Sequence, residues 1–107
     1  YKRQTFNKLT RYSTSGIATE MPPSLQAFLW QSIDDWNVDG LPLDYLQVFK
    51  FKKVADGLYA IEHTQEEPER TIVYYVGGDL EVESVVGKTV FVIDDGDHST
   101  MLFASEY

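Results

Sequence analysis

The chain has 107 residues, no cysteine, 43% hydrophobic side chains and 17 acidic against 9 basic residues, which give a net charge of -8. This length and apolar content predict one compact domain, and the missing cysteines exclude disulfides, thiolate metal sites and thiol catalysis. The negative charge disfavours direct binding to nucleic acid or to an anionic membrane, because phosphate groups attract basic surfaces.

Basic residues are concentrated at the start of the chain. The first acidic residue is Glu20, and four basic side chains precede it: Lys2, Arg3, Lys8 and Arg11. We therefore divide the chain into a basic N-terminal arm, residues 1–10, and a single α+β domain, residues 11–107. Three alternatives stay open for the arm: it is free in solution, it packs on its own domain, or it binds a partner.

Two elements are predicted before residue 40. Residues 12–19 are rich in β-forming side chains and precede a proline pair, which predicts a strand. Apolar side chains spaced by three and four positions then predict an amphipathic helix over residues 23–38, bounded by proline and glycine. On this helix Trp30 falls beside the polar side, so it is either covered by the arm or a strand, or it anchors a protein partner.

An alternation of period two follows the helix. It predicts strands over residues 45–54 and 58–65, joined by a tight turn. A three-residue loop with Gly57 in the left-handed conformation pairs Phe51 with Ile61, and we choose this register over that of a two-residue turn.

The same register gathers a polar group at one end of the apolar face. Its four members are Tyr45, Gln47, His63 and Gln65. We interpret this group as the edge of a candidate pocket, in which His63 could act as a general acid or base. A half-buried histidine with a purely structural role is the competing interpretation.

Four further strands are expected in the second half of the chain. The segments are residues 70–76, a weaker strand over 80–85, and a hairpin formed by 88–93 and 100–104. The fold class is therefore α+β, with one amphipathic helix packed on a mostly antiparallel sheet of five or six strands.

The acidic loop over residues 94–99 resembles a calcium site only in part. Thr100 stands where a calcium loop needs glycine, so we expect no metal. Phosphate-binding glycine loops and nucleophile elbows are absent from the sequence, and no cofactor is expected.

Four blocks in this order resemble the domain-of-unknown-function 960 family: RYxTxGI from residue 11, PxLQxxLWxxID from residue 23, DYLQVF from residue 44 and IxHxQExP from residue 61. The resemblance implies a small protein of Gram-positive bacteria, often carried on mobile elements, with no established activity. It supplies no site residues.

We expect a cytoplasmic, non-enzymatic protein-interaction module that uses Trp30 or the polar group around His63. The acidic balance favours a protein partner that is basic or nucleic-acid-binding, and the resemblance favours a mobile-element accessory or an inhibitor of a host factor. The alternative is a small-ligand binder or hydrolase built around His63. The chain is expected to be a monomer or a homodimer without a membrane segment.

Overall fold

The computed structural model describes residues 5–107. The first four residues of the predicted basic arm, which include Lys2 and Arg3, lie outside this range. The described residues form one six-stranded sheet with the strand order β1-β6-β5-β2-β3-β4. Neighbouring strands are antiparallel except β1 and β6, which are parallel. The main elements are β1 (Arg11–Ser13), α1 (Ser15–Glu20), α2 (Pro23–Val38), β2 (Leu46–Ala55), β3 (Leu58–Gln65), β4 (Arg70–Val76), β5 (Thr89–Asp94) and β6 (Ser99–Phe103).

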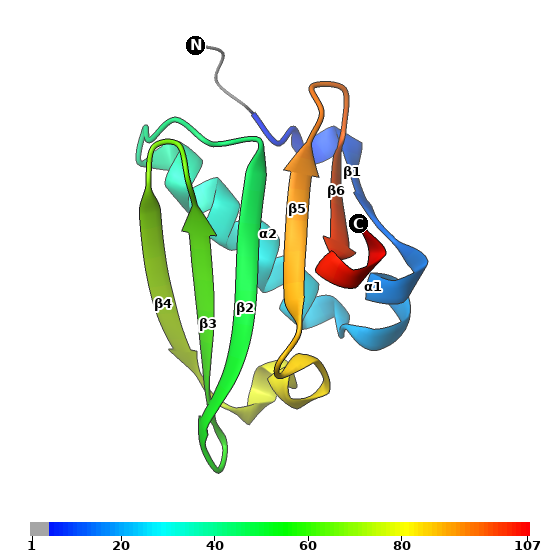
Figure 1. The fold of residues 1–107 in the computed structure, drawn as a ribbon, viewed down its shortest axis with the longest axis vertical. Helices are drawn as coiled ribbons and strands as arrows, with labels where there is room; N and C mark the ends of the chain where they lie inside the picture. The colour runs from blue at the N-terminus through cyan, green and yellow to red at the C-terminus, as the bar shows by residue number, and fades with distance from the viewer. Residues whose placement is uncertain (1–4) are drawn as a thin grey trace.

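The long helix α2 crosses one face of the sheet (Figure 1) and has the bounds that the sequence predicts. Its buried side chains follow the predicted spacing of three and four positions, and they are Leu25, Leu29, Ser32, Ile33 and Trp36. Burying a large apolar side chain stabilises a fold by roughly 1.5–3 kcal/mol, so this stripe fixes the helix on the sheet. The predicted α+β class, with one main helix on a mostly antiparallel sheet, is confirmed.

The strand predicted over residues 12–19 is wrong beyond Ser13. Thr14 caps the short helix α1, because its Oγ1 accepts a hydrogen bond from the Ile17 backbone N–H at 3.3 Å. Ile17 is fully buried in the core. A side-chain cap and one buried anchor therefore outweigh the β propensity of this segment.

The β2–β3 hairpin has the predicted register, with Phe51 opposite Ile61. Its loop differs from the prediction, because Ala55 pairs with Leu58 across a two-residue turn and the register shifts between Lys53 and Ala55. An extra residue in β2 thus gives the pairing that we assigned to a longer loop. The predicted strand over residues 70–76 and the β5–β6 hairpin are confirmed.

The weak strand predicted over residues 80–85 is wrong. This segment forms two 3-10 helices, η2 (Gly78–Leu80) and η3 (Val82–Val85). Val82 and Val85 are both fully buried. Side chains three positions apart point to opposite faces of a strand but to the same side of a 3-10 turn, so burial of both valines requires the turn.

The described part of the predicted N-terminal arm packs on the domain. Phe6 is 1% exposed, and its backbone N–H donates to Asp94 Oδ2 at 3.0 Å. Lys8 and Arg11 lie within 4.0 Å of Asp34 on α2. The Phe6 hydrogen bond to β5 and the Lys8–Asp34 ion pair with α2 therefore join this segment to both layers of the fold.

The two faces of the sheet differ in what covers them. The inner face lies against α2, whereas Figure 1 shows the outer face of β2, β3 and β4 turned away from the helix. Near β5, the C-terminal Tyr107 packs edge-on against Phe91, with ring centroids 5.8 Å apart. The outer face of β2–β4 is thus open in the described part of the chain. Within residues 5–107, no helix is long and apolar enough to cross a bilayer.

Candidate functional site

Three of the predicted site residues meet beneath α2. Gln47 on β2 and His63 and Gln65 on β3 are at most 1% exposed. Phe49 lies opposite His63 in the hairpin, as the predicted register requires. Ser32 of α2 reaches this group from the other layer.

The amide of Gln65 sets the direction of the hydrogen-bond network. Its Nε2 donates to the backbone oxygens of Pro42 and Pro68 at 3.0 and 2.9 Å. Its Oε1 therefore faces inward, where it accepts from Gln47 Nε2 at 2.8 Å and from the backbone N–H of Asp44 at 3.0 Å. Gln47 must then turn its own Oε1 towards His63.

His63 uses both of its ring nitrogens. Gln47 Oε1 lies 2.6 Å from Nε2 and can only accept, so Nε2 carries the proton and donates. Nδ1 then accepts from the Ser32 hydroxyl at 2.6 Å, and the hydroxyls of Ser32 and Tyr74 are hydrogen-bonded at 3.0 Å. The imidazole is therefore held in one tautomer with no free lone pair for a substrate or a metal ion.

Aromatic rings cover the two flat sides of His63. The Trp36 ring is stacked at a centroid distance of 3.7 Å and the Phe49 ring at 4.3 Å. The Arg70 guanidinium lies over the far side of Trp36, 4.8 Å from the ring centroid. Burial, followed by the positive charge of Arg70, lowers the pKa of His63 from 6.5 to about 3, so the ring is neutral at neutral pH.

The polar group is a sealed connection between helix and sheet. Gln47 and His63 are fully buried, and Gln65, which borders a hollow, is 1% exposed. The expected open pocket edge around His63 is therefore wrong. One residue in the sequence indicates that His63 is buried: Ser32 places a hydroxyl within the apolar stripe of α2. This hydroxyl offers the histidine a hydrogen-bond partner from the opposite layer.

Tyr45 does not belong to this group. Its side chain is 52% exposed, and it stands just before the first residue of β2. The alternation of faces starts only within the strand, so assigning Tyr45 to the buried face was wrong.

Trp30 is partly buried at the edge of the core. The Arg11 guanidinium lies 4.6 Å from the Trp30 ring centroid, and Arg11 Nη1 donates to Asp34 Oδ2 at 3.2 Å. Strand β1 thus covers the indole, as the first of the two hypotheses for Trp30 predicts. A role of Trp30 as a partner anchor stays a prediction.

The acidic loop between β5 and β6 is organised by its own backbone. Asp95 Oδ1 accepts hydrogen bonds at 3.0 Å from the backbone N–H groups of His98 and Asp97, which lower the pKa of the Asp95 carboxyl. Within residues 5–107, no group of three or more His, Cys, Asp or Glu side chains is placed to hold a metal ion. The carboxylates of this loop act as turn-forming acceptors.

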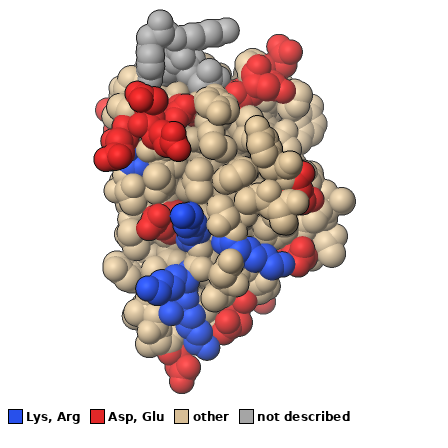
Figure 2. All heavy atoms as spheres, viewed as in Figure 1, with Lys and Arg blue, Asp and Glu red and all other residues tan. Residues whose placement is uncertain are grey.

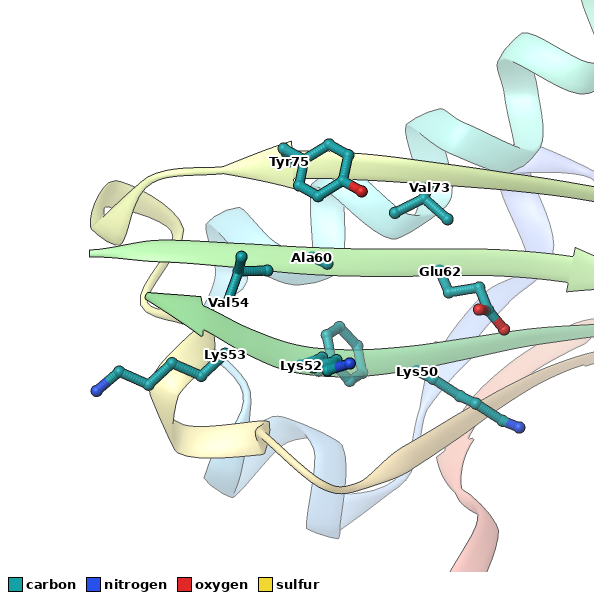
Figure 3. A pocket seen from close by; sticks show the side chains of 9 residues that line it. Lys50, Lys52, Lys53, Val54, Ala60, Glu62, Val73 and Tyr75 are labelled. Carbon is teal, nitrogen blue, oxygen red and sulfur yellow. The ribbon is translucent and has the colours of Figure 1, made fainter. Parts of the chain in front are cut away.

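The outer face of β2–β4 carries a hollow of about 540 Å³ (Figure 3). Two rows of paired residues cross it: Lys52 lies beside Ala60 and Ala60 beside Tyr75, and in the next row Glu62 lies between Lys50 and Val73. The small Ala60 side chain leaves a depression between Lys52 and Tyr75. The tyrosine is 67% exposed.

Lys50 and Lys52 are unusual among the basic side chains. Seven of the nine basic residues fall within residues 5–107, and five of these seven form ion pairs with carboxylates. Within the described range, Lys50 and Lys52 are exposed and form none. Figure 2 shows basic side chains gathered on the lower half of this face with acidic side chains beside them, and further acidic side chains towards the upper end.

The alternation in β2 predicts both lysines on the face opposite the polar group but does not indicate this surface. Tyr75 and Val73 reach the lysines only through the pairing of β3 with β4, which the chain order does not reveal residue by residue. One feature of the sequence points to this surface: two lysines stand at alternate positions of a strand, so their side chains share one face.

Comparisons with known proteins bear on the fold and the family. The crystal structure of a protein of unknown function from Enterococcus faecalis matches with a TM-score of 0.74 and 23% sequence identity, over 100% of this chain and 97% of that chain. None of the curated proteins matches significantly. A family profile described as staphylococcal protein of unknown function (DUF960) matches residues 10–106, which include the four sequence blocks. The chain therefore belongs to the DUF960 family.

Proposed function

We propose that this protein is a non-enzymatic interaction module that binds a protein partner through the outer face of β2–β4. One observation carries the proposal: this open face combines exposed apolar side chains with two lysines that form no ion pair among the residues that the structure describes. Val54, Val73 and Tyr75 are all large, exposed hydrophobic residues, and all three border the hollow. Exposed apolar groups gathered on one surface are typical of interaction sites, and tyrosine is enriched at binding hot spots.

The alternative of a small-ligand binder or hydrolase around His63 loses its physical basis. A general base must reach the proton that it removes, and both nitrogens of His63 are hydrogen-bonded within the core. Burial also keeps the imidazole neutral far below neutral pH. We therefore do not assign a reaction to this cluster.

The total charge supports a further part of the proposal. Long-range attraction acts through the sum of charges, and -8 favours a partner that is basic or nucleic-acid-binding overall. A role as a mobile-element accessory or as an inhibitor of a host factor is compatible with such a partner and remains a proposal.

Site-specific photo-cross-linking tests the proposed face. A benzoylphenylalanine placed at Tyr75 samples the outer face, and the same group at Val38, an exposed position at the end of α2, is the matched control. We expect a cross-linked protein of defined mass from a Gram-positive cell lysate at position 75 and not at position 38. Equal products at both positions, or none at either, would contradict the proposal.

A further inference from the structure

The hollow on the outer face continues along the hairpin as a groove. A second hollow of about 180 Å³ borders the first and shares Lys50 and Glu62 with it. Together they follow β2 from Val54 to Leu46. Eight steps at the usual strand rise of ~3.3 Å per residue give a length of about 26 Å, which accommodates roughly eight residues of an extended chain.

The two sides of this groove differ in chemistry. Lys50 and Lys52 stand on the β2 side, whereas Val73 and Tyr75 stand on the β4 side. Strands lie ~4.8 Å apart, so about 10 Å separates the two sides, with Ala60 of β3 as the floor. Extended peptides project successive side chains in opposite directions, and a peptide of alternating character would match both sides at once.

The charges of the groove favour an acidic occupant. Lys53 is already paired with Glu83 and Asp56, and two carboxylates border the groove, Glu62 in both hollows and Glu66 in the smaller one. Among the described residues, Lys50 and Lys52 form no ion pair, and they lie about 6.7 Å from each other along the strand. This distance is also the spacing of every second side chain in an extended partner.

We propose that this groove binds an extended acidic segment of a partner protein. Two carboxylates at alternate positions of the segment meet Lys50 and Lys52, and the intervening apolar side chains contact Val73 and Tyr75. The inference rests on the proposed function and adds the chemistry of the partner. It also concerns a local contact: at physiological salt charges are screened beyond ~8 Å, so the segment interacts with the two lysines more than with distant carboxylates.

Two other occupants fit the same surface less well. A nucleic acid carries a regular series of phosphates beyond the groove, where the molecule is acidic, with 17 acidic residues in all. A second copy of the chain that docks through the same face would bring its own Lys50 and Lys52 to this groove, together with the groove carboxylates Glu62 and Glu66. A short acidic segment supplies two carboxylates and the apolar contacts without either problem.

Fluorescence anisotropy provides the test. The probe is a fluorescein-labelled eight-residue peptide that alternates glutamate with leucine. The comparison probes are the same peptide with lysine in place of glutamate and an eight-nucleotide oligothymidylate. We expect the wild-type protein to bind the glutamate peptide saturably and at least tenfold more tightly than either comparison probe.

Two variants test the groove itself. Lys50→Gln with Lys52→Gln removes both free charges, and Ala60→Leu fills the floor; each is expected to weaken binding at least tenfold. The control Lys8→Gln with Lys88→Gln removes the same total charge from side chains outside the groove and should change the Kd less than twofold. Circular dichroism spectra of each variant check that it keeps the fold.

The outcomes separate the two proposals. Equal loss of binding in the control variant, tighter binding of the oligothymidylate, or dimerisation that Ala60→Leu abolishes would overturn the acidic segment as occupant. If the glutamate peptide fails to bind while position 75 still cross-links a protein, the proposed function stands and this inference is wrong. If both experiments fail, both proposals are wrong.

Discussion

Acidification should destabilise this fold through His63. The folded protein keeps the imidazole neutral, with a pKa of about 3, because α2 and the sheet exclude water from it. In the unfolded chain the same group returns to its ordinary pKa of ~6.5. The unfolded state therefore binds a proton first, and the contribution of His63 to stability is complete above about pH 6.5 and is lost as the pH falls towards 3.

The size of the effect follows from the two pKa values. Each pH unit between them lowers the free energy of unfolding by about 1.4 kcal/mol. Between pH 7.5 and pH 4.5 the loss from this one group is roughly 2–3 kcal/mol, a large share of the 5–15 kcal/mol typical of a domain.

Urea denaturation followed by tryptophan fluorescence measures this loss. His63→Gln removes the titrating ring and, at pH 7.5, should itself lower the stability by about 2–4 kcal/mol, since it loses the stacking and leaves a cavity. The curves of stability against pH for wild type and variant should then converge by roughly 2–3 kcal/mol on acidification.

The control is His98→Gln, which removes the other histidine of the sequence from an exposed loop outside the His63 cluster and should keep the loss of stability that His63 causes. If wild type and His63→Gln lose the same stability between pH 7.5 and pH 4.5, the folded protein does not keep the imidazole neutral. That result would refute the proposed cause of the acid sensitivity.

Three further predictions concern the N-terminal segment. Phe6→Ala should lower the free energy of unfolding by about 3–5 kcal/mol in urea denaturation, because it empties a buried site; a loss below about 1 kcal/mol would mean that this segment is dispensable. Arg11→Ala should cost about 1–2 kcal/mol and shift the tryptophan emission to longer wavelength as Trp30 becomes hydrated, whereas an unchanged spectrum would contradict the cover. Thr14→Ala should cost about 1 kcal/mol in thermal denaturation by removing the α1 cap and the hydrogen bond of the hydroxyl to Glu106, and Thr14→Ser should restore most of it; equal losses in both variants would exclude a role of the hydroxyl.

The elements best predicted from the sequence are those whose pattern repeats. The apolar spacing of α2 and the alternation in β2 and β3 each extend over several turns or pairs, and burial on one face imposes such repeats directly. This is why the bounds of α2 and the pairing of Phe51 with Ile61 follow from the sequence. Short segments lack this redundancy: two buried valines decide η3, and one threonine cap decides α1.

The candidate site was harder to predict for a different reason. Alternation indicates that Gln47 and His63 share a face but does not indicate what covers that face. Ser32 and Trp36 of α2 close it, through contacts that join distant parts of the chain. The groove on the other face was hard to predict for the same reason, because its two sides come from β2 and β4. The strand β3 lies between the lysines and Tyr75.

The central claim is that the two faces of the sheet have separate roles, with a sealed polar cluster inside and a binding groove outside. The most direct measurement is an NMR titration of the isotope-labelled protein with the alternating glutamate–leucine peptide. We expect shifts in the amide signals of Lys50, Lys52, Ala60 and Tyr75, while the His63 imidazole signals stay in place. Shifts centred on His63, with the groove signals unchanged, would contradict the central claim.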